Sequence, residues 1–398
     1  MDMLSKQELL SRAAARTQTL TNGRLLLYAG ANLPSPEAQN AYAPALSAYP
    51  AMGPSFAKEQ PDTDLVSQLE VAVRSEICAL FEAAWAEPRL PSCTIANLAV
   101  FHAFSRPGDL LLAPSAAHGG HLSQRRGGTP ELAGLVVEDL PFDTQNCQLD
   151  AQAAAHQIRQ LRPVLVMLGR SVMIKPDDVV PVVEAAREVG ARTIFDASHV
   201  SGLIAGGTFP NPLSLGVDIM TSSTYKTIPG RPHSLIAGRD LQDGVHLAGF
   251  LDRMMLANYD AGKLPAFLVT LQNVRRDGAD YARRICLNSQ ALARELRQLD
   301  VTIIAPADDE VFTHQLLVPM DGELAAASVI AKLESVGILV GTCADPGVPG
   351  AYALRLGTQF LTAQGLGADD MALVARRLAS SLSQAKNKRM KVKRPDSF

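Results

Sequence analysis

The chain has 398 residues, 47% of them hydrophobic, and a formal net charge of -3 at pH 7. This length and apolar content suffice to bury one large core and suggest two or three structural units. The near-neutral charge gives no general attraction to polyanions, so we expect no nucleic-acid partner.

The N-terminal segment and the cysteines indicate a soluble protein of a reducing compartment. Charges interrupt every apolar run of residues 1–16 (MDMLSKQELLSRAAAR), and no run in the chain reaches the roughly 18 apolar residues of a membrane span. The five cysteines are scattered and never spaced as CxxC, which disfavours a disulfide framework and a zinc site. We therefore expect a cytoplasmic protein with no metal and no membrane contact.

The first half of the chain alternates between helical and strand-like patterns. Apolar residues spaced by three and four predict a helix over residues 64–84. Further along, the pattern predicts a helix over 95–107, strands over 109–113 and 164–168, a helix over 179–189, and strands over 191–195 and 218–221. Continuous apolar strands that alternate with helices need cover on both faces, so we expect an α/β domain with a mostly parallel sheet.

The pattern changes after about residue 250 and predicts a smaller C-terminal α+β domain. A long helical region covers 265–299, followed by strands over 301–305 and 315–318, a helix over 324–336 and a strand near 352–356. We divide the chain into an N-terminal arm (1–30), a large cofactor-binding α/β domain (31–250), a connecting helix with the small domain (251–385), and a basic tail (386–398) without an assigned function.

Two residues in the segment 193–237 suggest pyridoxal-5′-phosphate chemistry. Asp196 ends an apolar strand, where open α/β sheets place ligand-binding groups, and Lys226 follows a Ser/Thr-rich run after the next strand. This chemistry needs a lysine for the Schiff base and an acid at the pyridinium nitrogen. Both residue types are common, so spacing alone leaves a capping aspartate and a surface lysine as the alternative.

The wider pattern resembles the serine hydroxymethyltransferase family of fold-type I enzymes. The matching stretches are 96–100 (ANLAV), 107–109 (PGD), 118–122 (HGGHL), 196–204 (DASHVSGLI), 210–212 (PNP), 224–227 (TYKT) with Gly230, and 354–358 (LRLGT). The likeness covers roughly residues 25–375. It implies an aspartate aminotransferase-like large domain and pyridoxal phosphate as the cofactor.

The resemblance assigns roles around the cofactor ring. Lys226 would form the internal aldimine, Asp196 would pair with the pyridinium nitrogen, and His118 would stack on the ring. His199 matches a histidine near the cofactor O3′ and the substrate, and Ser171 matches a small residue near the cofactor.

The resemblance also assigns the two anion sites. In relatives the phosphate is held before a helix N-terminus, where free N–H groups and the helix dipole favour an anion. Arg355 matches the arginine that grips the substrate α-carboxylate in a planar bidentate fork, so the substrate would be an α-amino acid. The residues that occupy the phosphate position are Ser92, Cys93 and Thr94, with Ser223 as a further donor.

The chain departs from the family where relatives handle folate. The Tyr-x-Glu-Gly-Tyr stretch, whose glutamate moves protons during hydroxymethyl transfer, is replaced by residues 49–53 (YPAMG), and the pteridine surface is rewritten at 55–58 (SFAK). The Ser-Glu-Asn signature is now 30–32 (GAN), and Tyr225 replaces the histidine before the lysine. Loss of a positioned proton-transfer group typically costs ~10²–10⁴-fold in rate, so folate-dependent transfer is disfavoured.

We therefore expect a folate-independent enzyme that acts on a β-substituted α-amino acid by retro-aldol cleavage or β-elimination, in specialised amino-acid or natural-product metabolism. The proton carrier would be Lys226, Tyr225 or His199. One alternative is a genuine serine or α-methylserine hydroxymethyltransferase that uses tetrahydrofolate. Others are decarboxylation-linked chemistry on a modified amino acid and a pyridoxal-phosphate-binding regulator without turnover.

The resemblance finally implies a homodimer with shared active sites. Tyr49 and the loop 259–262, which contains Gly262, match segments that relatives donate to the cofactor of the neighbouring subunit. Both residues are therefore expected at the partner's cofactor.

Overall fold

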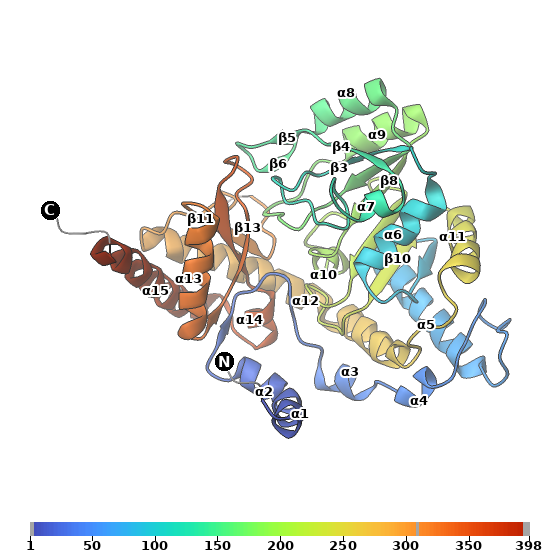
Figure 1. Ribbon diagram of the computed structural model, residues 1–398, viewed down its shortest axis with the longest axis horizontal. Coiled ribbons are helices and arrows are strands. Elements are labelled where there is room, and N and C mark those ends of the chain that lie inside the picture. Colours follow the sequence, from blue (N-terminus) through green and yellow to red (C-terminus); the bar gives the residue numbers. More distant parts are fainter. Residues whose placement is uncertain (1–3, 308–309, 393–398) are drawn as a thin grey trace.

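The computed structural model describes residues 4–307 and 310–392, with side chains up to residue 383. A seven-stranded sheet lies in the larger part of the molecule, on the right in Figure 1, in the order β2-β10-β9-β8-β7-β3-β4. The five strands from β9 to β4 are parallel, whereas β10 is antiparallel to both of its neighbours. The strands are β2 (Trp85–Glu87), β3 (Leu110–Ala113), β4 (Val136–Asp139), β7 (Leu165–Leu168), β8 (Arg192–Asp196), β9 (Ile219–Ser223) and β10 (Ser234–Gly238).

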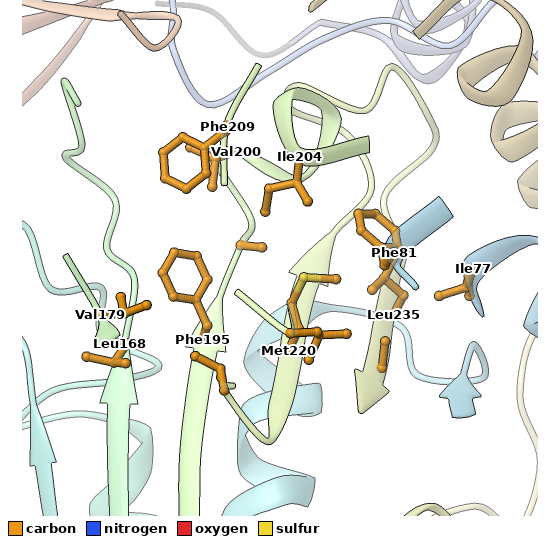
Figure 2. Close-up of a cluster of buried hydrophobic side chains, with 14 of the residues drawn as sticks. Ile77, Phe81, Leu168, Val179, Phe195, Val200, Ile204, Phe209, Met220 and Leu235 are labelled. Atoms are coloured by element: carbon orange, nitrogen blue, oxygen red, sulfur yellow. The ribbon is translucent and has the colours of Figure 1, made fainter. Parts of the chain in front are cut away.

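Helices cover both faces of this sheet, which confirms the predicted α/β class. Side chains alternate between the faces along each strand, so Phe195 and Ile194 of β8 enter different hydrophobic clusters. Figure 2 shows the cluster of Phe195, in which Phe209 lies above Phe195 with the ring centroids 6.4 Å apart, and Leu235 of β10 lies by Phe81. The larger helices of this part are α5 (Asp64–Phe81), α6 (Cys93–Phe104), α8 (Ala151–Leu161), α9 (Val180–Val189) and α11 (Leu241–Met254).

The helix α12 (Lys263–Gln298) joins the two parts of the molecule. Its residues up to Ile285 pack in the cluster of the large sheet, and those from Ala291 onward pack in a separate cluster. This second cluster underlies a three-stranded antiparallel sheet of order β11-β14-β13. Its elements are β11 (Gln315–Met320), α13 (Glu323–Ser335), β13 (Gly341–Ala344), β14 (Tyr352–Gly357) and α15 (Met371–Val392).

The N-terminal segment is tied to this second part of the molecule. Strand β1 (Leu25–Leu26) pairs in parallel with β12 (Ile338–Leu339), and Tyr28 forms a bridge with Leu356 of β14. The short elements that complete the fold are α1 (Lys6–Ala14), α2 (Arg16–Thr21), α3 (Pro36–Asn40), α4 (Pro44–Ser47), α7 (Thr129–Leu132), β5 (Phe142–Asp143), β6 (Gln148–Leu149), α10 (Ser201–Ala205), α14 (Gln359–Ala363) and a 3₁₀ turn over Ala368–Asp370.

The strand predicted at 301–305 is wrong. Only Ile304 pairs there, exchanging two backbone hydrogen bonds of 2.8 and 3.0 Å with Leu317. Pro306 follows closely and has no N–H group for a longer ladder. The predicted basic tail from residue 386 begins inside α15, while residues 393–398 and the side chains from 384 onward lie outside the described residues. The four-part division of the chain stays a prediction.

Two further expectations concern membranes and metals. None of the helices in the described ranges combines the length and hydropathy needed to span a bilayer. Within the same ranges, no three His, Cys, Asp or Glu side chains cluster in a way that could hold a metal ion.

Candidate active site

A cavity of about 50 Å³ lies where β7, β8 and β9 end, at the edge where open parallel sheets bind ligands. Most of its lining is polar, and it contains the predicted lysine and aspartate. The lining residues are Ser92, Cys93, Thr94, His121, Ser123, Gln124, Arg170, Ser171, Asp196, Ser198, His199, Ser223, Tyr225 and Lys226.

Asp196 is a buried carboxylate that is held in one orientation. It is the last residue of β8 and only 6% exposed. Its Oδ2 accepts from the Asn97 side-chain amide at 3.0 Å, and its Oδ1 accepts from the Ser198 N–H at 3.0 Å. Asn97 in turn accepts from the Thr221 hydroxyl at 2.7 Å, which fixes its own amide. A preoriented carboxylate of this kind suits a protonated ring nitrogen.

Gly169 permits the close approach of β7 and β8 beside this carboxylate. Its φ is +76°, and an added Cβ would lie 2.3 Å from the Asp196 carbonyl oxygen. Only glycine meets both demands. The preceding strand can therefore end directly against the residue that carries the acid.

Lys226 lies in the turn between β9 and β10 and is half-buried. Burial lowers the pKa of its amine, and Asp196 opposes this effect. A lowered pKa increases the share of neutral amine, which is the nucleophilic form. The backbone of the turn is fixed from two sides, because the Lys226 carbonyl accepts from Asn32 at 2.8 Å and the Thr227 hydroxyl donates to the His199 carbonyl at 3.0 Å.

Tyr225 precedes the lysine and lies beside its amine. The Lys226 Nζ is 5.6 Å from the centre of the Tyr225 ring. Burial raises the pKa of the Tyr225 phenol, so the hydroxyl stays protonated at neutral pH. Tyr225 is therefore a hydrogen-bond donor in this cavity rather than a base.

The prediction that His118 stacks on the cofactor ring is contradicted by its position. The His118 ring packs on Phe142 with centroids 4.3 Å apart and planes 8° apart, and its Nδ1 lies 3.0 Å from the Ser115 hydroxyl. It lines a neighbouring cavity instead. Gly119, with φ at +86°, turns the chain between the two histidines of the motif, and His121 reaches the site.

His121 is the histidine that the HGGHL motif delivers to the cavity. Its Nδ1 accepts from the Ser123 N–H at 3.2 Å, so the proton of the neutral ring is on Nε2. Burial lowers the pKa of His121, against the attraction of Asp196. A neutral, half-buried ring near the aspartate is suited to stack on an aromatic cofactor.

His199 belongs to a buried cluster that the sequence did not reveal. The Gln315 amide donates to the His199 Nδ1 at 2.9 Å and to the Ser171 carbonyl at 3.0 Å, and the His314 ring stacks on His199 with centroids 5.5 Å apart. Burial, with Lys226 and Arg355 adding to it, lowers the pKa of His199 well below its usual value. Because Nδ1 accepts, the neutral His199 carries its proton on Nε2.

The phosphate position predicted from sequence lies at the start of α6. The Ser92 hydroxyl caps this helix by accepting from the Ile95 N–H at 3.4 Å, and Ser92, Cys93 and Thr94 at the start of the helix line the cavity. Burial raises the pKa of the Cys93 thiol, so this side chain stays neutral beside an anion. Ser223 completes the group, and its N–H donates to the Ser198 hydroxyl at 3.0 Å.

Arg355 approaches the site from β14 of the smaller sheet. One of its nitrogens, Nη1, donates to the Ser171 carbonyl at 2.6 Å. Its buried Nε has no hydrogen-bond partner among the described residues. An unsatisfied guanidinium edge this deep in the protein fits a carboxylate ligand. Ser171 contributes its backbone carbonyl rather than its hydroxyl to this contact.

Arg170 is a lining residue that sequence reasoning missed. Its Nη2 donates to Asp177 at 2.7 Å and to the Cys147 carbonyl at 3.2 Å, and its guanidinium lies 5.1 Å from the centre of the Phe142 ring. This charge is paired with Asp177 inside the protein, although the buried Arg170 Nε, like that of Arg355, has no hydrogen-bond partner among the described residues.

Tyr49 and Gly262 are not part of the cavity in this chain. Tyr49 is 44% exposed, and the Gly262 N–H donates to the Ser47 hydroxyl at 2.9 Å. Their predicted place at a partner's cofactor stays a prediction. The rewritten segment after Tyr49 folds onto its own helix α5, where the buried Lys58 amine pairs with the buried Glu70 carboxylate at 2.6 Å.

Comparisons of the sequence with known proteins identify a single family. The family model described as serine hydroxymethyltransferase matches residues 14–378. The serine hydroxymethyltransferase of Methanopyrus kandleri is 33% identical over 322 residues, covering 79% of this chain and 75% of that protein. The one from Pyrobaculum neutrophilum is 34% identical over 360 residues, covering 89% and 84%.

A solved structure is similar over nearly the whole chain. It is the L-threonine transaldolase from Pseudomonas fluorescens, in the internal aldimine state, with a TM-score of 0.89 at 25% sequence identity. The likeness covers 95% of this chain and 87% of that one.

Proposed function

Because this chain belongs to the serine hydroxymethyltransferase family and is a pyridoxal-phosphate-dependent enzyme of fold type I, we propose that it breaks the Cα–Cβ bond of a β-hydroxy α-amino acid without folate. One observation carries the proposal. The cavity keeps a lysine amine and an oriented aspartate, and Arg355, whose buried Nε has no partner among the described residues, lies near enough to affect the pKa of Lys226, whereas segment 49–53 holds no carboxylate. A retro-aldol cleavage needs the first three groups but not folate.

The residues around the cavity fit pyridoxal phosphate. Asp196 would hold the proton of the ring nitrogen, the N-terminus of α6 would bind the phosphate, and His121 would lie against the ring. When bound, the cofactor supplies an electron sink for the electrons released at Cα. Lys226 would attach the cofactor through its amine.

The states of the side chains indicate which group accepts the proton of the β-hydroxyl. His199 holds its proton on Nε2 because Gln315 occupies Nδ1, and Tyr225 is protonated because burial raises its pKa. Both are donors. Lys226 is the group whose lowered pKa increases the share of neutral amine, so we assign the proton acceptor to Lys226 once its amine is free.

A comparison of substrates with and without tetrahydrofolate tests this function. We expect L-threonine or another β-hydroxy amino acid to yield glycine and an aldehyde at a rate that the folate leaves unchanged. Serine-to-glycine conversion should show no stimulation by the folate. The variant Ala51→Glu, which places a carboxylate at the rewritten position, would show at most a small response.

The folate-dependent reaction is the second candidate, because the curated relatives are named serine hydroxymethyltransferase. Strong stimulation of serine cleavage by tetrahydrofolate would establish it and would mean that another group replaces the missing carboxylate. In that case Ala51→Glu should not raise the rate.

We also propose a cytoplasmic homodimer with shared active sites and a biosynthetic role. Support comes from Tyr49 and Gly262, which lie outside the cavity of their own chain although relatives use the corresponding segments at the cofactor. Light scattering should find a dimer, and Tyr49→Ala should weaken cofactor binding. A fully active monomer would disprove the shared site.

A further inference from the structure

The ring of Tyr28 is held between two glycines near the active site. A Cβ added to Gly30 would lie 3.0 Å from Cε1 of the ring and 3.7 Å from its hydroxyl oxygen. On the other edge, a Cβ added to Gly341 would lie 2.9 Å from Cε2 and 3.2 Å from Cδ2. A Cβ at position 341 would force the ring to move, and one at position 30 would press against it. Because glycine has no side chain, positions 30 and 341 leave room for the Tyr28 ring.

This place is beside Arg355. In the smaller sheet, Gly341 of β13 is the direct cross-strand partner of Arg355 in β14. Directly opposed residues project their side chains to the same face, with Cβ atoms about 5 Å apart. The Tyr28 ring fills the space that a side chain at 341 would take, so it lies on the face of the sheet that carries the Arg355 guanidinium. The backbone bridge from Tyr28 to Leu356 fixes this register.

The hydroxyl of Tyr28 is available to a ligand. The residue is 43% exposed, and none of the described residues forms a hydrogen bond with its phenol oxygen. Arg355 also has an open edge, at Nε. The pKa shifts of the neighbouring groups agree with this placement. Burial lowers the pKa of Arg355, and Tyr28 acts to raise it. Tyr28 also contributes to the raised pKa of Tyr225.

We propose that Tyr28 is a substrate-binding residue whose hydroxyl donates a hydrogen bond to the α-carboxylate that Arg355 holds. This inference rests on the proposed role of Arg355 in binding an amino acid. A carboxylate has two oxygens with room for several donors, and a planar guanidinium fills one side only. The glycines at 30 and 341 are then specificity features of this chain, because they admit a tyrosine next to the arginine.

The test compares Tyr28→Phe with the wild-type holoenzyme. Loss of one hydrogen bond to a charged group should raise the KM, and the Kd from a titration of the cofactor absorbance, about tenfold or more for amino acids. The kcat should change little, because the phenol does not touch the bond that breaks. Binding of ethanolamine, which lacks the carboxylate, should be unchanged. Tyr352→Phe is the matched control, since Tyr352 lies three residues from Arg355 in β14 and so on the opposite face.

A second variant moves the Tyr28 hydroxyl without removing it. Gly30→Ala should push the Tyr28 ring aside slightly and raise KM by less than Tyr28→Phe does, whereas Tyr28→Ala with Gly30→Ser should restore part of the affinity by placing a hydroxyl in the vacated space. An unchanged KM in Tyr28→Phe, or an equal loss in Tyr352→Phe, would overturn the proposal. These outcomes are independent of folate, so they separate this inference from the proposed reaction.

Discussion

Asn97 and Asp196 are joined by a 3.0 Å hydrogen bond that ties helix α6 to the end of strand β8. The same amide group accepts from Thr221 of the neighbouring strand β9 at 2.7 Å. The helix that offers its N-terminus to an anion is thus locked to the acid that would hold the ring nitrogen. The two ends of a bound cofactor would be held by one rigid unit.

Asn97→Ala should therefore weaken cofactor binding as well as stability. The substitution removes the partner of the Asp196 Oδ2 and of the Thr221 hydroxyl, and an unsatisfied buried group typically costs about 1–3 kcal/mol. We expect the Kd for pyridoxal phosphate, from a fluorescence titration of the apoenzyme, to rise about tenfold. Asn211→Ala, which removes a 2.8 Å bond to the Phe81 carbonyl away from the cavity, should lower stability and leave that Kd unchanged. Equal Kd values in both variants would contradict the role of Asn97.

Lys226 should be the residue that binds the cofactor covalently. Borohydride reduction of the holoenzyme followed by peptide mapping should place the label on Lys226. Lys226→Ala should bind the cofactor reversibly and lose at least 10³-fold in kcat, because the attaching amine and the proposed proton acceptor disappear together. A label on another lysine, such as the paired Lys58, would disprove the assignment.

The two histidines of the HGGHL motif should behave differently. His121→Ala removes a ring from the cofactor cavity, so we expect weaker cofactor binding, a shifted absorbance maximum and a kcat at least tenfold lower. His118→Ala removes a ring that stacks on Phe142 in a neighbouring cavity, so it should lower the melting temperature with little change in the spectrum. The reverse pattern would restore His118 to the role that the sequence suggested.

These two histidines illustrate which features of the site local sequence patterns predict and which they do not. Periodicity placed most helices and strands within a few residues, and apolar strand ends located Asp196 and Lys226, because both follow from local chain patterns. The choice between two histidines three residues apart depends on a single backbone turn at Gly119, whose φ of +86° no periodicity reveals. Two neighbours in one motif can therefore face different cavities.

Residues from the smaller sheet were also missed, apart from Arg355. His314, which directly precedes β11, and Gln315, its first residue, reach His199 from more than a hundred residues away and look like ordinary residues in the sequence. The position of Tyr28 could not be predicted for the same reason, because it depends on the pairing of Gly341 with Arg355 in the sheet. Contacts between distant strands follow from tertiary packing, which a single sequence does not encode locally.

Buried histidines should make the protein less stable in acid. His233 is 3% exposed; its Nε2–H donates to the Pro88 carbonyl, and its Nδ1 has no partner in the described part of the chain. Burial lowers its pKa to about 4. A second buried ring, His314, is lowered by burial to about 3. Neither ring can readily take a proton while the protein is folded.

The protein should lose stability in acid because the pKa values of both histidines are lowered in the folded chain. Below pH 6.5 the unfolded chain protonates each histidine, whereas the folded chain does not until about pH 4 or 3, so stability falls as the pH drops through this window. From pH 7 to pH 5, each ring should lower the free energy of unfolding by about 2 kcal/mol.

Urea titrations with saturating pyridoxal phosphate at the two pH values measure the loss. His233→Gln keeps an N–H for the Pro88 carbonyl but cannot titrate, so its acid loss should be smaller than that of the wild type by about 2 kcal/mol. An equal loss in the variant would mean that His233 is already protonated in the folded protein at pH 5.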